Sequence, residues 1–127
     1  LILLLQPTSP MRRSMDLERA LDKLIDGDFD SVMSVSETDS KGHPFKQFII
    51  DGDEIRHWTK QGAKIVARQE LSKTYHKNGL VYAMTRQCII EQKEIFGRKH
   101  THSLIERPVV NIDTIEEIKY FEFLTTR

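Results

Sequence analysis

The feature that most constrains this chain is the apolar run from Leu1 to Leu5, which ends directly at Gln6 and Pro7. Five residues are far too few to span a bilayer. A short apolar run that stops at a turn signal is typical of a strand buried on both faces of a parallel sheet. Such a strand needs neighbours. We therefore expect part of the sheet to lie outside this sequence, and the chain to be a fragment of a longer domain.

A helix and a second strand follow this first strand. Ser14 is a candidate N-cap for a helix from about Met15 to Asp26, whose apolar residues recur at helical spacing, and Gly27 stands where a C′ glycine would end it. The next segment, Ser31–Ser36, has the composition of a short strand. This order predicts parallel pairing of the two strands with a right-handed crossover.

The middle of the chain carries a hairpin signal. Phe45–Ile50 is rich in β-forming residues, and Asp51-Gly52-Asp53 offers a tight turn into Glu54–Trp58. The apolar surface of this hairpin is large for a peripheral element, so we expect a second subunit to cover it and the protein to be a homodimer. The residues that form this surface are Phe48, Ile49, Ile50, Ile55 and Trp58.

The last third predicts two strands and two helices. Leu80–Met84 reads as a buried strand entered through Asn78-Gly79, and Thr85 caps a short helix that carries Cys88. Val109–Ile112 is strand-like, and Thr114 to Glu117 matches a capping box before a helix that ends near Leu124. The whole pattern predicts an open α/β sheet, one partial domain over residues 1–127, with 43–75 as an inserted hairpin subdomain.

Charge and cysteine content narrow the function classes. The chain has 19 basic and 19 acidic residues and a formal net charge of zero, so nothing draws it generally to nucleic acid or to an anionic membrane. The single cysteine, Cys88, cannot form an internal disulfide, which fits a cytoplasmic protein. His100 and His102 lack a third ligand at a spacing typical of zinc sites.

Three polar loops have the position of a ligand site. In open α/β sheets, ligands bind beyond the carboxyl ends of the parallel strands. The loops Gln6–Arg13, Tyr75–Gly79 and Asn111–Thr114 each adjoin a predicted strand and are the segments richest in polar and turn residues.

Several of these segments, taken in order, resemble a known family. Leu4-Leu5-Gln6-Pro7-Thr8-Ser9-Pro10-Met11-Arg12 resembles the LLQPTSPLR signature of the acylneuraminate cytidylyltransferases, or CMP-sialic acid synthetases. Further matches lie in the family's order at Asp30–Val35, Arg68-Gln69, Tyr75–Tyr82 and Asn111–Thr114. QPTSP alone is moderately specific, whereas the ordered set is strong and covers nearly the whole chain.

The resemblance implies a fold and a reaction. The fold is doubly wound, of the nucleotide-diphospho-sugar transferase type, with a hairpin insertion through which two subunits dimerise. The reaction joins CTP to a nine-carbon 2-keto sugar acid, with Mg²⁺ on the triphosphate, and releases pyrophosphate. The chain would be the C-terminal two-thirds or so of such a protein. The family's N-terminal nucleotide loop is absent from this sequence, so we expect the chain alone to be inactive.

The resemblance also implies roles for single residues, each with a plainer alternative. Gln6 would contact the sugar acid, although its amide could instead satisfy loop backbone. Lys46, on a strand, and Arg68 would hold the sugar carboxylate, although both are ordinary surface residues by default. Asn78 and Gly79 would precede the floor of the sugar pocket, although the pair could be a simple turn. Tyr82 would line that pocket, and Arg12 would contact the nucleotide.

Asp113 is the candidate catalytic and metal-binding residue. Mg²⁺ takes carboxylate oxygens together with triphosphate oxygens, and an aspartate at a strand end could supply one. The plainer alternative is that Asp113 or Thr114 only caps the last helix. The family pattern is Asp-Ile-Asp-Thr, whereas this chain has Asn111-Ile112-Asp113-Thr114. Asn111 can offer an amide oxygen to the metal, but without charge.

Two other functions fit the sequence. One is a nucleotidyltransferase for a different sugar acid, such as the eight-carbon 3-deoxy-manno-octulosonate, although the QPTSP and Asn-Gly motifs favour the nine-carbon branch. The other is a non-catalytic relative that keeps the dimerising hairpin, which Asn111 and the missing nucleotide loop favour.

Overall fold

The computed structural model describes residues 1–64 and 71–126, so Arg68 lies outside the described residues. The chain divides into two compact units. One comprises Leu1–Ser36 with Lys77–Arg127, and the other is Glu37–His76. The inserted subdomain that we predict over 43–75 falls within the second unit, and its role in dimerisation stays a prediction.

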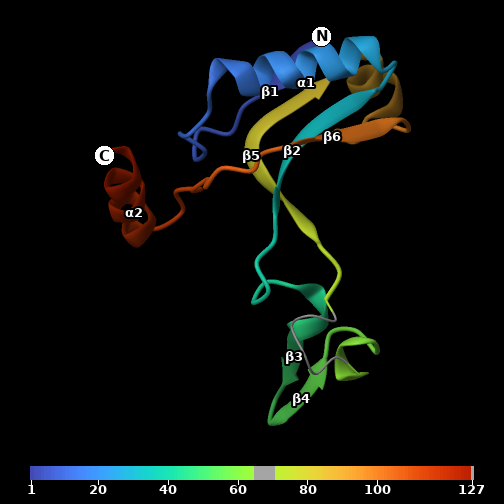
Figure 1. Ribbon diagram of the computed structural model, residues 1–127. Helices are drawn as coiled ribbons and strands as arrows, with labels where there is room; N and C mark the ends of the chain where they lie inside the picture. Colours follow the sequence, from blue (N-terminus) through green and yellow to red (C-terminus); the bar gives the residue numbers. More distant parts are fainter. Residues whose placement is uncertain (65–70, 127) are drawn as a thin grey trace. The chain divides into compact units, whose positions relative to one another are not determined.

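The first unit is built on a mixed four-stranded sheet (Figure 1). Its strands are β1 (Ile2–Leu4), β2 (Ser31–Glu37), β5 (Tyr75–Met84) and β6 (His100–Leu104), in the order β1-β5-β2-β6. β1 is antiparallel to β5, with Ile2 opposite Met84, and β2 is parallel to β6. The fold is therefore mixed α/β, as the sequence predicts. A doubly wound arrangement stays a prediction.

The predicted pairing of the first two strands is wrong. β5 lies between β1 and β2, because the most deeply buried strand takes a central place in the sheet. Every residue of β5 from Asn78 to Met84 is buried. β1, which we expected to be buried on both faces, is an edge strand of the described sheet, with Ile2 36% and Leu4 44% exposed.

Helix α1 (Ser14–Asp26) covers one face of this sheet. Its buried residues Ala20 and Leu24 pack in the main core with Val32, Val81 and Ala83. The helix is confirmed, but its N-cap is Arg13 rather than Ser14. At the other end, Gly27 has φ −90°, and the left-handed conformation falls on Asp28, at φ 51°.

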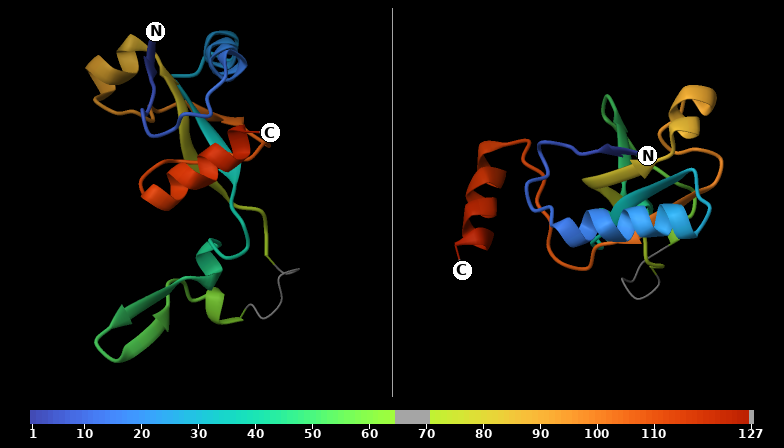
Figure 2. Two further views of the ribbon diagram at one scale, coloured as in Figure 1. Left: turned by 90° about the vertical axis from the view of Figure 1, so that its left-hand side faces the viewer. Right: turned by 90° about the horizontal axis from the view of Figure 1, so that it is seen from above.

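The opposite face of the sheet carries a short π-helix, Cys88–Gln92 (Figure 2). The Oγ1 of Thr85 accepts a hydrogen bond from the Cys88 backbone N–H at 3.1 Å, so the predicted cap is confirmed. Cys88 is buried with Tyr82 and Met84 in a second apolar cluster. Burial raises the pKa of the Cys88 thiol, which fits the predicted core role.

Two predictions about β5 and its surroundings need correction. Leu80–Met84 is a strand as predicted, but Asn78-Gly79 lies within β5 and not in a turn before it. Val109–Ile112 is not a strand, because its backbone bonds elsewhere: Ile112 N–H donates to the Thr8 carbonyl at 2.7 Å. The strand of this region is β6, whose His-Thr-His-Ser-Leu sequence has little apolar signal.

The second unit contains the predicted hairpin. β3 (Phe48–Asp51) and β4 (Glu54–His57) pair antiparallel, with Gly52 at φ 60° in the two-residue turn. The strand begins later than predicted, because a 3₁₀ helix occupies Pro44–Lys46. Lys46 is therefore on a helical turn and not on a strand. A second 3₁₀ helix spans Gly62–Lys64.

The chain's last element is helix α2 (Ile115–Thr125), which begins with the predicted capping box. The Thr114 hydroxyl accepts from Glu117 N–H at 3.3 Å, and the Glu117 carboxylate accepts from Thr114 N–H at 2.8 Å. No residue of α2 is buried. Within residues 1–64 and 71–126, no helix combines the length and apolar character needed to cross a bilayer.

Candidate functional site

The three loops that the sequence predicts for the ligand site converge on Ser9. This side chain is fully buried, and its hydroxyl lies 2.8 Å from Asn111 Oδ1 and 3.3 Å from the Asn78 carbonyl oxygen. Thr8 adds the backbone bond from Ile112 N–H. Segments separated by 69 and 102 residues in the sequence therefore meet at one point. The agreement concerns geometry, and the ligand roles of these residues stay predictions.

Gly79 allows the first loop to approach β5 closely. A Cβ on Gly79 would collide with Gln6 Oε1 and would lie 2.5 Å from Ser9 Oγ. Its φ of +73° also belongs to the left-handed region that favours glycine. Glycine is thus required here for two reasons, and the Gln6 amide rests directly on the β5 backbone. Gln6 is otherwise exposed.

The Asn78 side chain is engaged inside the protein. It is 1% exposed, its Oδ1 accepts from Ser34 Oγ at 2.5 Å, and its Nδ2 donates to Ser36 Oγ at 2.9 Å. These bonds occupy both the oxygen and the nitrogen of the amide, so little of it is left for a ligand. The sequence signal for this network is the pair of serines, Ser34 and Ser36, at alternate positions of one strand.

Arg12 joins the loop to β5 through its guanidinium. Its Nε donates to the Leu80 carbonyl at 2.5 Å and one terminal nitrogen donates to the Gln6 carbonyl at 2.8 Å. Two of its nitrogens therefore hold the protein backbone. The contact of Arg12 with the nucleotide stays a prediction.

Tyr82 lies two residues beyond Leu80 on the face of the sheet opposite α1. It is 8% exposed and packs against Met84 and Cys88. Burial raises the pKa of its phenol above the ordinary value, so the hydroxyl is protonated at neutral pH. Tyr82 is thus a wall of the apolar cluster, and its place in a sugar pocket stays a prediction.

The side-chain oxygens of Asp113 and Asn111 differ in whether they already accept a hydrogen bond. Asp113 is exposed, and its carboxylate makes no ion pair or hydrogen bond among the described residues. Asn111 Oδ1 already accepts from Ser9. Among the described residues no group of three or more His, Cys, Asp or Glu side chains could hold a metal. A single carboxylate suits Mg²⁺ only where phosphate oxygens and water complete its shell.

Neither of the two residues predicted to hold a carboxylate belongs to the described part of the first unit. Lys46 lies in the second unit, where its side chain is exposed at the end of a 3₁₀ helix. Arg68 falls outside the described residues. Both roles stay predictions.

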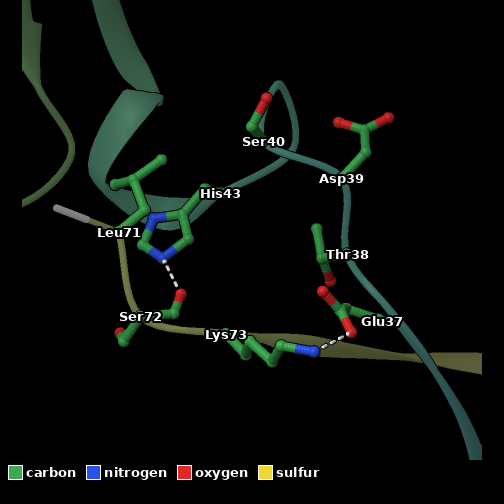
Figure 3. Close-up of a pocket in the computed structure, with 8 residues that line it drawn as sticks. All are labelled: Glu37, Thr38, Asp39, Ser40, His43, Leu71, Ser72 and Lys73. Carbon is green, nitrogen blue, oxygen red and sulfur yellow. Dashed lines mark hydrogen bonds and ion pairs between the residues drawn. The ribbon is translucent and has the colours of Figure 1, made fainter. Parts of the chain in front are cut away.

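The second unit has a polar pocket of about 140 Å³ (Figure 3). On its wall, His43 is 3% exposed; its Nδ1 accepts from Phe45 N–H at 3.1 Å, so its Nε2 carries the hydrogen directed at the Ser72 carbonyl. The imidazole is thereby fixed in orientation between two backbone groups. The pocket is lined by Glu37, Thr38, Asp39, Ser40, His43, Leu71, Ser72 and Lys73.

The sequence was compared with protein-family models and with curated proteins. No family model matches it. An N-acylneuraminate cytidylyltransferase of Streptococcus agalactiae serotype V (strain ATCC BAA-611 / 2603 V/R) is 29% identical over 116 residues, which cover 90% of this chain and 27% of that protein. That of serotype III (strain NEM316) is 28% identical over the same length.

The chain therefore spans about a quarter of the length of these relatives, less than the two-thirds that we expected. The family resemblance itself is confirmed by these matches: over nine tenths of its length, this chain is similar to part of the N-acylneuraminate cytidylyltransferases, which are nucleotidyltransferases.

Proposed function

We propose that this chain forms the sugar-binding side of a cytidylyltransferase that joins CTP to a nine-carbon 2-keto sugar acid of the sialic acid type. The observation that carries the proposal is the meeting of the Gln6 loop, Gly79 and Asn111 at the buried Ser9 hydroxyl. The names of the relatives support the reaction class. The activity belongs to the protein that contains a complete nucleotide site.

In the proposed reaction, the anomeric hydroxyl oxygen of the sugar forms a bond to the α-phosphorus of CTP. The bond from that phosphorus to the bridging oxygen of the β-phosphate breaks, pyrophosphate leaves, and the hydroxyl proton is released. Little covalent chemistry falls to the protein, so its work is to position the sugar and to neutralise phosphate charge.

The proposed roles follow the accessibility of each group. Gln6 is exposed and presents its amide to the sugar, whereas the buried Gly79 allows that residue to lie directly against β5. Tyr82 keeps its proposed place in the wall of the sugar pocket. Asn78 is a positioning residue because its amide is already bonded to Ser34 and Ser36. Lys46 and Arg68 pair with the sugar carboxylate.

Mg²⁺ is the proposed cofactor, and the donor set fits it in part. Asp113 offers a carboxylate without a partner among the described residues, and Asn111 offers a neutral oxygen that already accepts a hydrogen bond from Ser9. When bound, the ion would neutralise charge on the triphosphate. Asp113 is the residue proposed to hold it, with the remaining ligands from phosphate and water.

The test is pyrophosphate release from CTP by the full-length gene product, offered N-acetylneuraminate, legionaminate, pseudaminate and 3-deoxy-manno-octulosonate in separate assays. We expect release with one of the nine-carbon acids. Release with the eight-carbon acid alone would replace the proposed substrate, and release with none would overturn the reaction.

A matched pair of variants assigns any activity to the site. Gln6→Leu should raise KM for the sugar acid about tenfold, the effect of losing one or two hydrogen bonds to a substrate. Gln61→Leu removes an equally exposed glutamine from the second unit and should leave KM unchanged. Equal effects of the two changes would contradict the proposed role of Gln6.

A non-catalytic assembly module is the second candidate, which Asn111 favours because it removes one charge from the proposed metal site. Titration of CTP into the full-length gene product with and without Mg²⁺ separates the two. Binding that requires Mg²⁺ supports the enzyme, and absence of CTP binding supports the module.

A further inference from the structure

Arg107 and Asp16 form a buried ion pair that the sequence did not single out. Arg107 Nη1 donates to Asp16 Oδ1 at 2.9 Å and Nη2 donates to Asp16 Oδ2 at 2.5 Å. The side chains are 20% and 1% exposed. A fork of two parallel bonds fixes the orientation of both groups, which a single ammonium contact does not do.

The same pair holds the end of the Gln6 loop. Arg107 Nη2 also donates to the Met11 carbonyl at 2.9 Å, and Asp16 Oδ2 accepts from Arg13 N–H at 2.8 Å. The last residues of the loop and the first turn of α1 are thus tied to the segment that follows β6. Arg12, between these two attachment points, is the residue that reaches across to Leu80.

The segment after Arg107 continues along the loop in the reverse direction. Ile112 donates its backbone N–H to Thr8, and Asn111 accepts from Ser9. Residues 107–112 therefore hold the loop at both ends, near residues 11–13 and near residues 8–9. The Arg107–Asp16 pair is the charged part of this attachment.

Stability alone does not explain a charged pair at this place. Desolvation offsets most of the attraction in a buried ion pair, and well-packed apolar residues of similar volume are often equally stable. What the ionic fork adds is direction, because it fixes the Met11 carbonyl and the Arg13 amide together.

We propose that Arg107 and Asp16 are positioning residues that hold the Gln6–Arg13 loop in its ligand-binding conformation. The inference rests on the proposed function in assigning a ligand to that loop. The attachment itself is independent of the ligand. Neither residue touches the ligand; both act through Met11 and Arg13 on Gln6 and Ser9.

The test uses two variants of the full-length gene product. Asp16→Leu/Arg107→Met replaces the pair by apolar side chains, and Arg107→Lys keeps the charge but loses the fork. Lys99→Met is the matched control, because it removes an exposed ion pair with Asp28 from the same unit. Amide hydrogen exchange, thermal unfolding and the Kd for N-acetylneuraminate are measured for each.

We expect exchange at the Ser9 and Ile112 amides to accelerate about tenfold or more in both variants, while exchange at Thr85, which follows β5 and donates its N–H to the Asp30 carbonyl, stays as in the wild type. The Kd for N-acetylneuraminate should rise about tenfold in both variants. The unfolding temperature should be nearly unchanged in Asp16→Leu/Arg107→Met, because apolar side chains replace both charges and leave neither unpaired. Lys99→Met should change none of these values.

The outcomes separate the two proposals. Unchanged exchange at Ser9 and Ile112 in a folded variant overturns the positioning role, as does acceleration that Thr85 shares equally. If the wild type does not bind N-acetylneuraminate, the proposed substrate fails, and the exchange measurements still decide whether the pair positions the loop. If the double variant does not fold, Arg107→Lys decides alone.

Discussion

Gly79 is the residue at which backbone conformation and close contact coincide. We predict that Gly79→Ala lowers the free energy of unfolding by about 1–3 kcal/mol, the cost of a side chain held at positive φ, and displaces Gln6 and Ser9 in addition. Chemical denaturation and amide shifts of the Gln6 loop measure the two effects.

Gly52 provides the matched control for this change. Its φ is +60°, but no atom lies within 4 Å of a Cβ built there. Gly52→Ala should therefore show only the conformational cost, about 1–2 kcal/mol, with no shift in the loop. A loop undisturbed by Gly79→Ala would contradict the contact between Gly79 and Gln6.

A second prediction concerns the charge of residues 111 and 113 and the Mg²⁺ concentration that the enzyme requires. Asn111→Asp adds a carboxylate that can still accept from the Ser9 hydroxyl, so it should lower the Mg²⁺ concentration needed for half-maximal pyrophosphate release. Asp113→Asn should raise that concentration about tenfold or more. Glu116→Gln, an equally exposed carboxylate in the next turn, is the control and should change nothing. If the Mg²⁺ concentration for half-maximal pyrophosphate release is the same in all three variants as in the wild type, Asp113 does not bind the metal.

At the scale of one element, the stability of α2 depends on its capping box. Thr114→Ala removes the hydroxyl that accepts from Glu117 N–H, and should cost about 1 kcal/mol of helix stability. Carbon chemical shifts of residues 115–125 report the loss. Thr125→Ala at the far end removes only hydroxyl donors to carbonyls and should leave the helix content almost unchanged.

The same box makes α2 sensitive to acid. The backbone N–H of Asp113, the Thr114 hydroxyl and the Thr114 N–H lower the pKa of Glu117 below its ordinary value. A lowered pKa means that the carboxylate stabilises the helix above the unfolded pKa, about 4.3, and that this stabilisation is lost as the pH falls through the folded value. Helix shifts followed from pH 6 to pH 3 should show the loss. Glu117→Gln should abolish that pH dependence, and a variant that keeps it would assign the effect to another group.

The strands show which elements can be predicted from local sequence patterns. Leu80–Met84 and the β3–β4 hairpin follow apolar composition and a glycine turn, and both predictions are confirmed. β6 was missed because an edge strand can be polar, and its pairing with β2 is made by backbone groups that any residue supplies. Val109–Ile112 has strand composition, yet its backbone bonds to the Gln6 loop.

At the scale of the whole molecule, the hairpin has an apolar face that is exposed among the described residues. Phe48, Ile50 and Ile55 share one face of the two-stranded sheet, since Ile50 lies opposite Ile55 and Phe48 opposite His57. Their exposed fractions are 51%, 73% and 64%. A two-stranded sheet of this kind is marginal in water by itself. We propose that a second copy of the protein covers this face.

The resulting prediction concerns the oligomeric state. Ile50→Lys should convert a dimer to a monomer at micromolar concentration, because it places a charge in the apolar contact. Sedimentation velocity measures the mass. Ile90→Lys makes the same change at an exposed isoleucine of the first unit, and its mass should match the wild type. A wild-type monomer at these concentrations would contradict the proposed dimer.

The sequence alone determined the local elements and the relatives of this protein. Helix α1, the capping box of α2, the hairpin and the QPTSP loop depend on neighbouring residues, whose spacing and chemistry can be read directly from the chain. The residues proposed for the ligand were also named from order and type, including Gln6, Gly79 and Asp113.

Only the tertiary structure decided the strand order and which side chains already form hydrogen bonds with other parts of the protein. The strand order, with β5 between β1 and β2, depends on pairing between strands far apart in the sequence, which no local pattern states. Asn78 and Arg12 proved to hold protein groups, and Arg107 proved to reach Asp16 across 91 residues. A hydrogen bond between distant residues depends on the position of both partners in space, so it appears only when the chain has folded. For that reason the QPTSP loop, visible as a motif from the start, gained its anchor at Arg107 only in three dimensions.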